Sequence, residues 1–286
     1  RSTPKPSSAA SDVYKRQGLK KIAKAYIKRF KDTELGKQIK IRAGDICYNK
    51  GKYKDAIEFY EEVDDPYAMY WRGKAYILLD DAKRAEKVLR QLVEKYPKSD
   101  FTRKARYELG KIYFDAKDYQ NALDQFLILH EKGGYEASEI YLARSYAKLG
   151  NPVKGEQILK DLIQKGNKLL MDDAYIALGE LYVERGNFVE ARNYLAKVEN
   201  EAKRPEAQFK LAESYYKEGK YSEAMREFLR VKYLRESEYV TPAIFYAAQC
   251  AEKLGRTLEA QKLYRMVIDR GDNKELVKKA KELLKK

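Results

Sequence analysis

Side chains suited to acid–base, nucleophilic or metal chemistry are sparse in this sequence. Its single histidine, His130, stands at the end of an expected helix, just before a Gly-Gly pair. The helix dipole stabilises a histidine at a helix C-terminus, so this position has a structural explanation. The sequence contains no CxxC, HExxH, Walker or dinucleotide-binding glycine motif. We therefore predict that the protein is not an enzyme and uses no cofactor and no metal.

Three pairs of adjacent aspartates are the other candidates for acid–base chemistry. They are Asp64 and Asp65, Asp80 and Asp81, and Asp172 and Asp173. All three pairs fall at turns or at the starts of expected helices. Aspartate at such a place accepts hydrogen bonds from the free N–H groups of the first helical turn, and capping is the role that we expect.

Helix–turn–helix units repeated along the chain are the elements that must position any functional side chain. Residues 207–231 hold one complete unit, in which two apolar helical faces flank Gly219 as the break. The same frame recurs along the chain with successive offsets of 29, 37, 33, 36, 33 and 36 residues. The small residues that anchor the seven units are Gly44, Gly73, Gly110, Ala143, Gly179, Ala212 and Ala248.

Three further positions support the frame. Twelve residues after the anchor the residue is always small, and four residues later it is always large: Ala56 and Tyr60, Ala85 and Leu89, Ala122 and Phe126, Gly155 and Leu159, Ala191 and Leu195, Ala224 and Phe228, Ala260 and Tyr264. A small residue lets two helices cross closely, and the large one fills the adjoining gap. Seven residues after the anchor stands glycine, or Asp80 or Lys117 in two units, which predicts a left-handed end of the first helix.

A period near 34 residues with this arrangement resembles the tetratricopeptide repeat (TPR) family. The resemblance implies an all-α fold, a right-handed α-solenoid of about seven repeats whose first helices line a concave groove. We expect one continuous array over residues 18–272, which begins with an orphan helix at 18–31. A capping helix is expected at 273–286, where the apolar side chains share one stripe and lysines fill the rest.

The first seventeen residues do not share this periodicity. Residues 7–17, SSAASDVYKRQ, match the translation of a widely used sequencing adapter, so we expect residues 1–17 to be a disordered, adapter-derived segment. The expectation that follows is a truncated metagenomic sequence whose true N-terminus is missing. Residues 25–48 align without gaps on residues 91–114, which makes 18–31 the second helix of a repeat whose first helix is lost.

Basic residues cluster near the ends of the chain. The formal net charge is +15, and residues 18–42 hold nine Lys or Arg against Asp32 and Glu34. These cations are not interleaved with exposed aromatic residues in a nucleic-acid-binding motif, and we interpret them as solvated side chains. We expect no nucleic-acid partner. Because no apolar run is long enough to span a bilayer, we expect at most a peripheral membrane association.

The two cysteines are Cys47 and Cys250, in the first helices of the first and last units. Nearly the whole array separates them, so we expect no disulfide between them. We expect both to be small buried side chains. Unpaired cysteines favour a reducing compartment without deciding it.

The first helices carry the functional signal. Large apolar residues recur three before and four after the anchor, on one helical stripe, and charged residues stand one after it. The residues that we expect to bind a peptide in the concave groove are Ile41, Tyr48, Tyr70, Lys74, Ile77, Tyr107, Lys111, Phe114, Ile140, Arg144, Ile176, Glu180, Phe209, Glu213, Tyr216 and Phe245. The alternative for part of this stripe is packing against neighbouring first helices.

The charged positions change sign along the array. Lys74, Lys111 and Arg144 make repeats two to four basic, whereas Glu180 and Glu213 make repeats five and six acidic. Such an order would set the orientation of an extended or helical peptide in the groove.

Residues 95–126 resemble repeats of bacterial cell-envelope proteins, namely the outer-membrane-assembly lipoproteins and the periplasmic Tol-Pal coordinator. We predict a non-enzymatic protein–protein interaction scaffold that binds a protein or peptide segment in its groove. The alternatives are a bacterial cell-envelope assembly factor and a regulatory module of a larger protein. The compartment stays open between the periplasm or cell envelope and the cytoplasm, and the sequence does not identify the partner.

Overall fold

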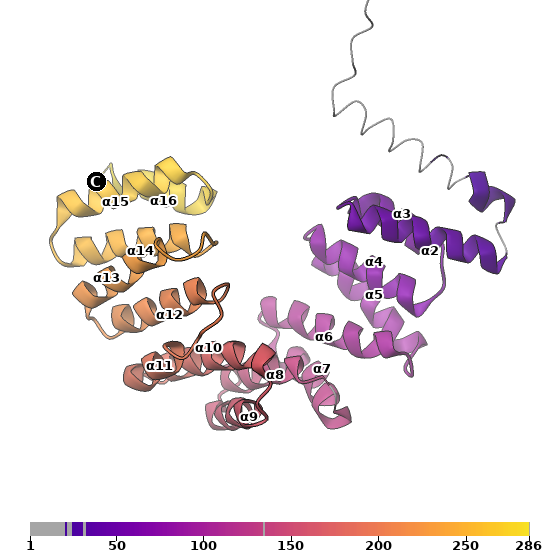
Figure 1. The fold of residues 1–286 in the computed structure, drawn as a ribbon, viewed down its shortest axis with the longest axis horizontal. Helices are drawn as coiled ribbons and strands as arrows, with labels where there is room; N and C mark the ends of the chain where they lie inside the picture. The colour runs from indigo at the N-terminus through magenta and orange to yellow at the C-terminus, as the bar shows by residue number, and fades with distance from the viewer. Residues whose placement is uncertain (1–20, 22–24, 31–32, 134, 286) are drawn as a thin grey trace, which may run out of the picture. The chain divides into compact units, whose positions relative to one another are not determined.

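The computed structural model describes residues 21, 25–30, 33–133 and 135–285, and these residues form helices joined by turns, without strands (Figure 1). The predictions for residues 1–17 lie outside the described residues. Of the expected orphan helix, residues 25–29 are helical. The chain divides into two compact units, Arg1–Lys132 and Gly133–Lys286.

Unit 1 contains the helix pairs of repeats one to three. They are α2 (Glu34–Asn49) with α3 (Tyr53–Glu61), α4 (Pro66–Leu78) with α5 (Ala82–Lys95), and α6 (Asp100–Asp115) with α7 (Tyr119–Lys132). The two helices of each pair pack on one another, and the second helix of a pair packs on the first helix of the next, α3 on α4 and α5 on α6. The first helices α4 and α6 also contact each other, as stacked repeats do.

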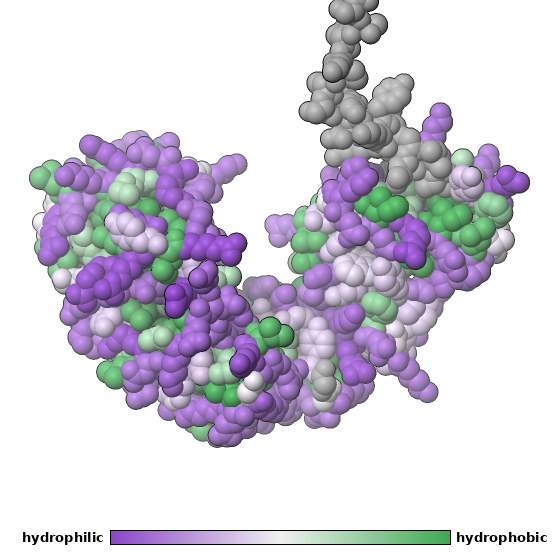
Figure 2. Space-filling model, in the orientation of Figure 1, coloured by the Kyte–Doolittle hydropathy of each residue, from purple (hydrophilic) through white to green (hydrophobic). Residues whose placement is uncertain are grey.

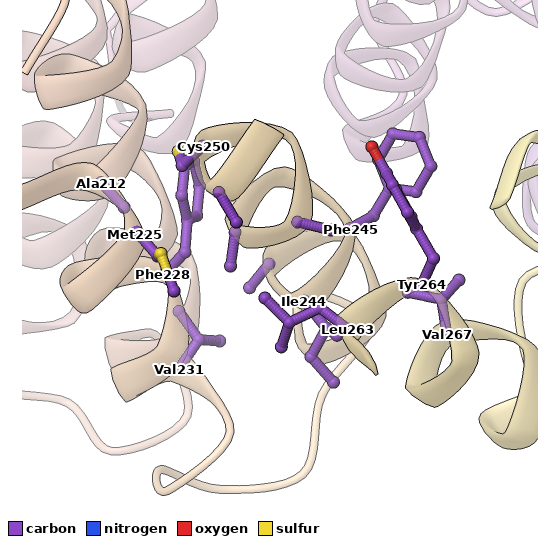
Figure 3. Packing of buried hydrophobic residues seen from close by; sticks show 14 of the residues in the cluster. Ala212, Met225, Phe228, Val231, Ile244, Phe245, Cys250, Leu263, Tyr264 and Val267 are labelled. Carbon is purple, nitrogen blue, oxygen red and sulfur yellow. The ribbon is translucent and has the colours of Figure 1, made fainter. Parts of the chain in front are cut away.

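Unit 2 contains repeats four to seven and one further helix. The pairs are α8 (Ala137–Lys148) with α9 (Pro152–Gln164), α10 (Lys168–Glu184) with α11 (Phe188–Leu195), α12 (Arg204–Lys217) with α13 (Tyr221–Val231), and α14 (Val240–Lys253) with α15 (Thr257–Arg270). Figure 3 shows one core cluster to which four consecutive helices, α12 to α15, contribute side chains. The last helix, α16 (Lys274–Leu283), packs on α14 and α15 and buries Ala280, which gives unit 2 its capping helix.

Each repeat is held together by a close crossing of its two helices. A Cβ atom placed on Gly44 would lie 2.5 Å from Cε1 of Tyr60, and one on Gly110 would lie 2.5 Å from Cε1 of Phe126. Both distances are too short for a real contact, so the ring of the second helix occupies the space that the missing side chain leaves. The large residues at this position are 0–3% exposed in all seven repeats: Tyr60, Leu89, Phe126, Leu159, Leu195, Phe228 and Tyr264. The predicted pairing of small and large residues is confirmed.

Repeat four exchanges the two small residues. Its anchor is Ala143, and its glycine is Gly155 on the second helix. A Cβ on Gly155 would lie 2.5 Å from the carbonyl oxygen of Ala143, so the close approach is to backbone here rather than to a ring. The crossing therefore tolerates the exchange of the two small residues, and repeats six and seven carry alanine at both positions.

The turn between the two helices has the same backbone conformation in every repeat. Gly51, Gly150, Gly186, Gly219 and Gly255 have φ values of 70°, 85°, 73°, 83° and 70°. Asp80 and Lys117 hold the equivalent position with φ values of 58° and 64°. This left-handed region suits glycine and is unfavourable for a residue with a Cβ. The predicted left-handed ends are confirmed, including both that lack glycine.

Replacing Lys117 with glycine should stabilise unit 1. The exposed lysine holds a left-handed conformation that costs on the order of 1 kcal/mol for a residue with a Cβ, and glycine removes that cost. We expect Lys117→Gly to raise the free energy of unfolding by roughly 0.5 to 1 kcal/mol in urea titrations. Lys117→Ala, the matched control, keeps the Cβ and should give no gain. A stability gain in the alanine variant equal to that of glycine would contradict this explanation.

Candidate peptide-binding face

The residues expected three positions before each anchor are mostly packed inside their units. Exposed fractions are only 1–8% for Tyr70, Ile140, Ile176, Phe209 and Phe245. Each belongs to a core cluster of its own unit. A partner cannot reach these five side chains without displacing that packing, so the accessible part of the expected site is narrower than the stripe.

The two remaining members of that row, Ile41 and Tyr107, are half-buried. The ring of Tyr107 packs on Phe126 of its own repeat, with 6.2 Å between ring centroids. The ammonium nitrogen of Lys111 lies 5.4 Å from the centroid of the Tyr107 ring, a cation–π distance. This contact brings together two of the residues that the sequence assigned to the site.

The residues of the expected site that stand four positions after an anchor stay partly accessible. Tyr48, Ile77, Phe114 and Tyr216 are all half-buried. The three aromatic rings each rest on another ring, as Tyr48 does on Trp71 with 4.8 Å between centroids. Packing from one side fixes the orientation of a ring and leaves part of it for a ligand.

Two lysines in unit 1 share one carboxylate that the sequence analysis did not assign to the site. The Nζ atom of Lys74 donates to Glu108 Oε1 at 2.7 Å, and Lys111 Nζ lies 3.6 Å from Glu108 Oε2. Glu108 itself is only 6% exposed. Two lysines facing one buried carboxylate leave one positive charge in excess. We call Tyr48, Lys74, Ile77, Tyr107, Lys111 and Phe114 the unit 1 face.

In unit 2 the charged positions form a ladder of ion pairs instead of an open groove surface. A guanidinium nitrogen of Arg144 lies 2.8 Å from Glu180, whose other oxygen is 3.3 Å from the ammonium nitrogen of Lys210. Lys210 also lies 3.2 Å from Glu213. The ladder crosses three consecutive first helices, α8, α10 and α12. Arg144, which was expected to extend a basic surface into repeat four, is therefore neutralised by repeat five.

Glu206, an acidic residue that the sequence analysis did not assign to the site, lies next to this ladder. Burial raises the pKa of the Glu206 carboxyl, the nearby charge of Glu180 adds to the rise, and Arg144 opposes it. Burial also raises the pKa of the neighbouring Tyr239 hydroxyl. Charged residues stand two before the anchor in three repeats, as Arg42, Glu108 and Lys210, and this pattern could have identified Glu108 and Lys210 as partners of the expected charged row.

Aspartates that could have served acid–base chemistry have structural roles. Asp65 Oδ1 accepts from the N–H of Tyr67 at 2.8 Å, and Asp81 Oδ1 accepts from that of Arg84 at 3.1 Å, so both cap helices as predicted. Asp172 instead accepts from two N–H groups of the loop after α11, at 3.3 and 2.9 Å. Within the described part of the chain, no cluster of three or more His, Cys, Asp or Glu side chains could hold a metal ion.

Comparisons with known proteins agree with this architecture. Three models of the tetratricopeptide repeat family match residues 67–99 and 242–270, residues 176–238, and residues 38–65. Together they cover more than half of the chain, so the fold is a TPR solenoid and the chain belongs to the tetratricopeptide repeat family. A comparison with curated proteins found no match.

Solved structures with similar folds are distant in sequence. A tetratricopeptide repeat protein from Parabacteroides merdae aligns with 18% identity over 87% of this chain and 97% of that chain, with a TM-score of 0.69. PilW, a type IV pilus biogenesis factor, aligns with 16% identity over 74% of this chain and 97% of that chain, with a TM-score of 0.59. A signal transduction ATPase with a TPR sensor, from Pyrococcus horikoshii, aligns with 19% identity over 85% of this chain and 43% of that chain, with a TM-score of 0.60.

TPR proteins are typically non-catalytic scaffolds for protein–protein interaction, and that general function applies to this chain. Across the residues that the structure describes, none of the helices has the length and apolar character needed to cross a membrane. Cys47 and Cys250 are both buried, and no disulfide joins them, as expected. Burial raises the pKa of the Cys250 thiol to about 12.

The buried thiol should be inert in the folded protein. A thiolate reacts with maleimides, and a pKa near 12 keeps Cys250 protonated at pH 8. In the unfolded chain its pKa returns to about 8.5, which makes the thiolate available. In a Cys47→Ala variant, we expect maleimide labelling of Cys250 to be slow in buffer and fast in concentrated urea. Equal labelling rates in the two conditions would contradict the burial of this side chain.

Proposed function

We propose that this TPR scaffold holds a peptide segment of a partner protein against the unit 1 face. The observation that carries the proposal is the half-buried aromatic and aliphatic row, with Tyr107 and Phe114 on α6 and Ile77 on α4, beside two lysines. Aromatic side chains fixed from one side lose little entropy when a ligand packs on them, which suits them to act as binding anchors.

The expected ligand is a peptide with apolar side chains near an acidic residue. Lys74 and Lys111 share the carboxylate of Glu108, so one positive charge is left to attract a carboxylate of the partner. Lys111 lies over the Tyr107 ring, and a bound carboxylate there would place the adjacent residues of the peptide against that ring. Charge at such a site steers association, whereas the apolar contacts provide most of the affinity.

The first helices of unit 2 are a poorer candidate for the same role. Their apolar residues Ile140, Ile176 and Phe209 are buried, and their charges already neutralise one another in the ladder. A ligand would have to separate Arg144 from Glu180 before it gained a charge of its own. Breaking a partly buried ion pair leaves an uncompensated charge, which is costly.

Cell-envelope assembly is a second candidate function. The linker and repeat at residues 95–126 resemble those of bacterial envelope proteins, and PilW, described as a pilus biogenesis factor, has a similar fold. A regulatory module is the third, since the similar TPR array of the Pyrococcus horikoshii ATPase is described as a sensor. Both candidates are compatible with a peptide bound at the unit 1 face, and they differ in the partner that supplies it.

Peptides selected from a random display library against the whole chain provide the test. We expect the selected peptides to combine apolar and acidic residues, and Ile77→Ala to weaken their binding by roughly 1 to 3 kcal/mol. Lys111→Glu should mainly slow association, with a smaller effect at high salt. Leu78→Ala is the matched control, because Leu78 is the next residue of α4 and is already 49% exposed.

Stability must be measured alongside binding, because Ile77 also contacts the core of unit 1. Binding is compared at a temperature at which the melting curves show that both face variants and the control are folded. Selected peptides whose binding is unchanged by Ile77→Ala and by Lys111→Glu would show that the unit 1 face is not the site.

A further inference from the structure

Two lysines of α6 are each held over an aromatic ring of the same helix. The ammonium nitrogen of Lys104 lies 4.9 Å from the centroid of the Phe101 ring. That of Lys111 lies 5.4 Å from the centroid of the Tyr107 ring. The Phe101 ring is fixed in turn by Tyr67 of α4, with 5.4 Å between ring centroids. A cation that rests on a fixed ring samples fewer positions than an unrestrained lysine, so it loses less entropy when it binds an anion.

Lys104, Tyr107 and Lys111 lie on one stripe of α6. They stand three and four residues apart, so their directions around the helix axis fall within about 60° of one another. Lys104 is exposed, whereas Tyr107 and Lys111 are half-buried. The seven residues from Lys104 to Lys111 correspond to about 10 Å along the axis. The stripe therefore presents two cations with an aromatic ring between them.

The stripe keeps a positive excess after its ion pairs are taken into account. Lys104 forms no ion pair within the described part of the chain, while Lys111 shares Glu108 with Lys74. Asp115, exposed one turn after Lys111, ends the basic part of the stripe. Figure 2 shows purple, hydrophilic residues mixed with pale residues of intermediate hydropathy over α4 and α6. Carboxylates opposite Lys104 and Lys111, with an apolar side chain between them, would complement this surface.

The spacing of the two lysines fits an α-helical ligand. Carboxylates seven residues apart on a helix lie about 10 Å apart on one face, and side chains three or four residues along that face lie between them. In a β-strand, side chains on one face repeat at about 6.6 and 13 Å, and neither distance fits. In a polyproline II helix, residues three apart are separated by about 9 Å, but no residue between them points the same way. An α-helix thus offers both the carboxylates and an apolar side chain for the Tyr107 ring.

We propose that the partner segment bound at the unit 1 face is an α-helix with carboxylates at positions i and i+7 and apolar side chains at i+3 and i+4. The inference rests on the proposed function and adds Lys104 to the residues of that site. One carboxylate pairs with Lys104 and the other with Lys111, while the apolar side chains pack on Tyr107. A third carboxylate one turn beyond Lys111 would face Asp115 and be repelled.

Two alanine-based helical peptides of identical composition test the spacing against the whole chain. Both carry leucines at i+3 and i+4 and a glutamate at i. The second glutamate stands at i+7 in one peptide and at i+5 in the other, which turns it away from the first. In fluorescence anisotropy titrations we expect the i+7 peptide to bind, and the i+5 peptide to bind at least roughly tenfold more weakly. Circular dichroism of the free peptides shows whether the two are equally helical.

Charge reversal locates the two carboxylates. Lys104→Glu should weaken the i+7 peptide by at least roughly tenfold, and so should Lys111→Glu. Two further peptides carry lysine in place of the glutamate at i or at i+7. One of them should restore binding to Lys104→Glu, and the other should restore binding to Lys111→Glu. Lys87→Glu is the matched control, because Lys87 is an exposed lysine of the second helix α5, and it should leave binding unchanged. The melting temperature of each variant shows whether the chain is folded.

Several results would overturn the helical ligand. They are no binding of the i+7 peptide, equal binding of the i+7 and i+5 peptides, unchanged binding in a folded Lys104→Glu chain, and failure of both lysine peptides to restore binding. Tighter binding of a polyproline peptide with glutamates three residues apart would overturn it as well, in favour of an extended segment.

Failure of this inference and failure of the proposed function give different results. Display-selected peptides that are weakened by Ile77→Ala and Lys111→Glu, but not by Lys104→Glu, would refute the helical spacing and leave the unit 1 face as the site. Selected peptides that none of the three substitutions weakens would refute the unit 1 face itself.

Discussion

The close crossing of two helices around one small residue is the constraint on which the rest of the structure depends. Where the anchor is glycine, a large side chain of the second helix fills the space of the absent Cβ, as Phe126 does at Gly110. The crossing fixes how far apart the helices of a pair lie and which way the first helix turns its remaining faces. Tyr107 and Lys111 stand near Gly110 on α6, so their position relative to α7 follows from that contact, while contacts with α4 and α5 place α6 within unit 1. Packing at this density leaves little freedom for the pair to adjust.

Much of the fold was predictable from sequence, because the crossing and the turn each need particular residues. Glycine recurs where the backbone is left-handed, and even Asp80 and Lys117 could be assigned to that conformation from their place in the repeat. The accessibility of the functional stripe was less predictable. Ile41 and Ile176 hold the same place in their repeats, yet the first is half-buried and the second is 1% exposed. Periodicity defines the face of a helix on which a residue lies, whereas its exposure depends on the size of the side chains that a neighbouring helix brings to it.

The ion pairs between successive repeats could not be predicted from the sequence for a related reason. A sequence shows that Arg144 and Glu180 hold equivalent places in successive repeats, but not that their side chains reach each other across 2.8 Å. Contacts between repeats therefore convert an expected gradient of charge into a ladder in unit 2, whereas in unit 1 two lysines share Glu108. The difference makes the two units unequal as binding surfaces. It also gives the first helices of unit 2 a structural role that their composition alone does not reveal.

A double-mutant cycle on the crossing of repeat three tests the central claim most directly. Urea unfolding would be measured for Gly110→Ala, for Phe126→Leu and for the two together. Gly110→Ala alone should lose roughly 1 to 3 kcal/mol, because its methyl group has no space beside the ring. The smaller leucine should restore part of that space, so the double variant should lose less than the sum by on the order of 1 kcal/mol. Losses that add to within about 0.5 kcal/mol would show that the glycine and the ring do not depend on each other, which would contradict the account.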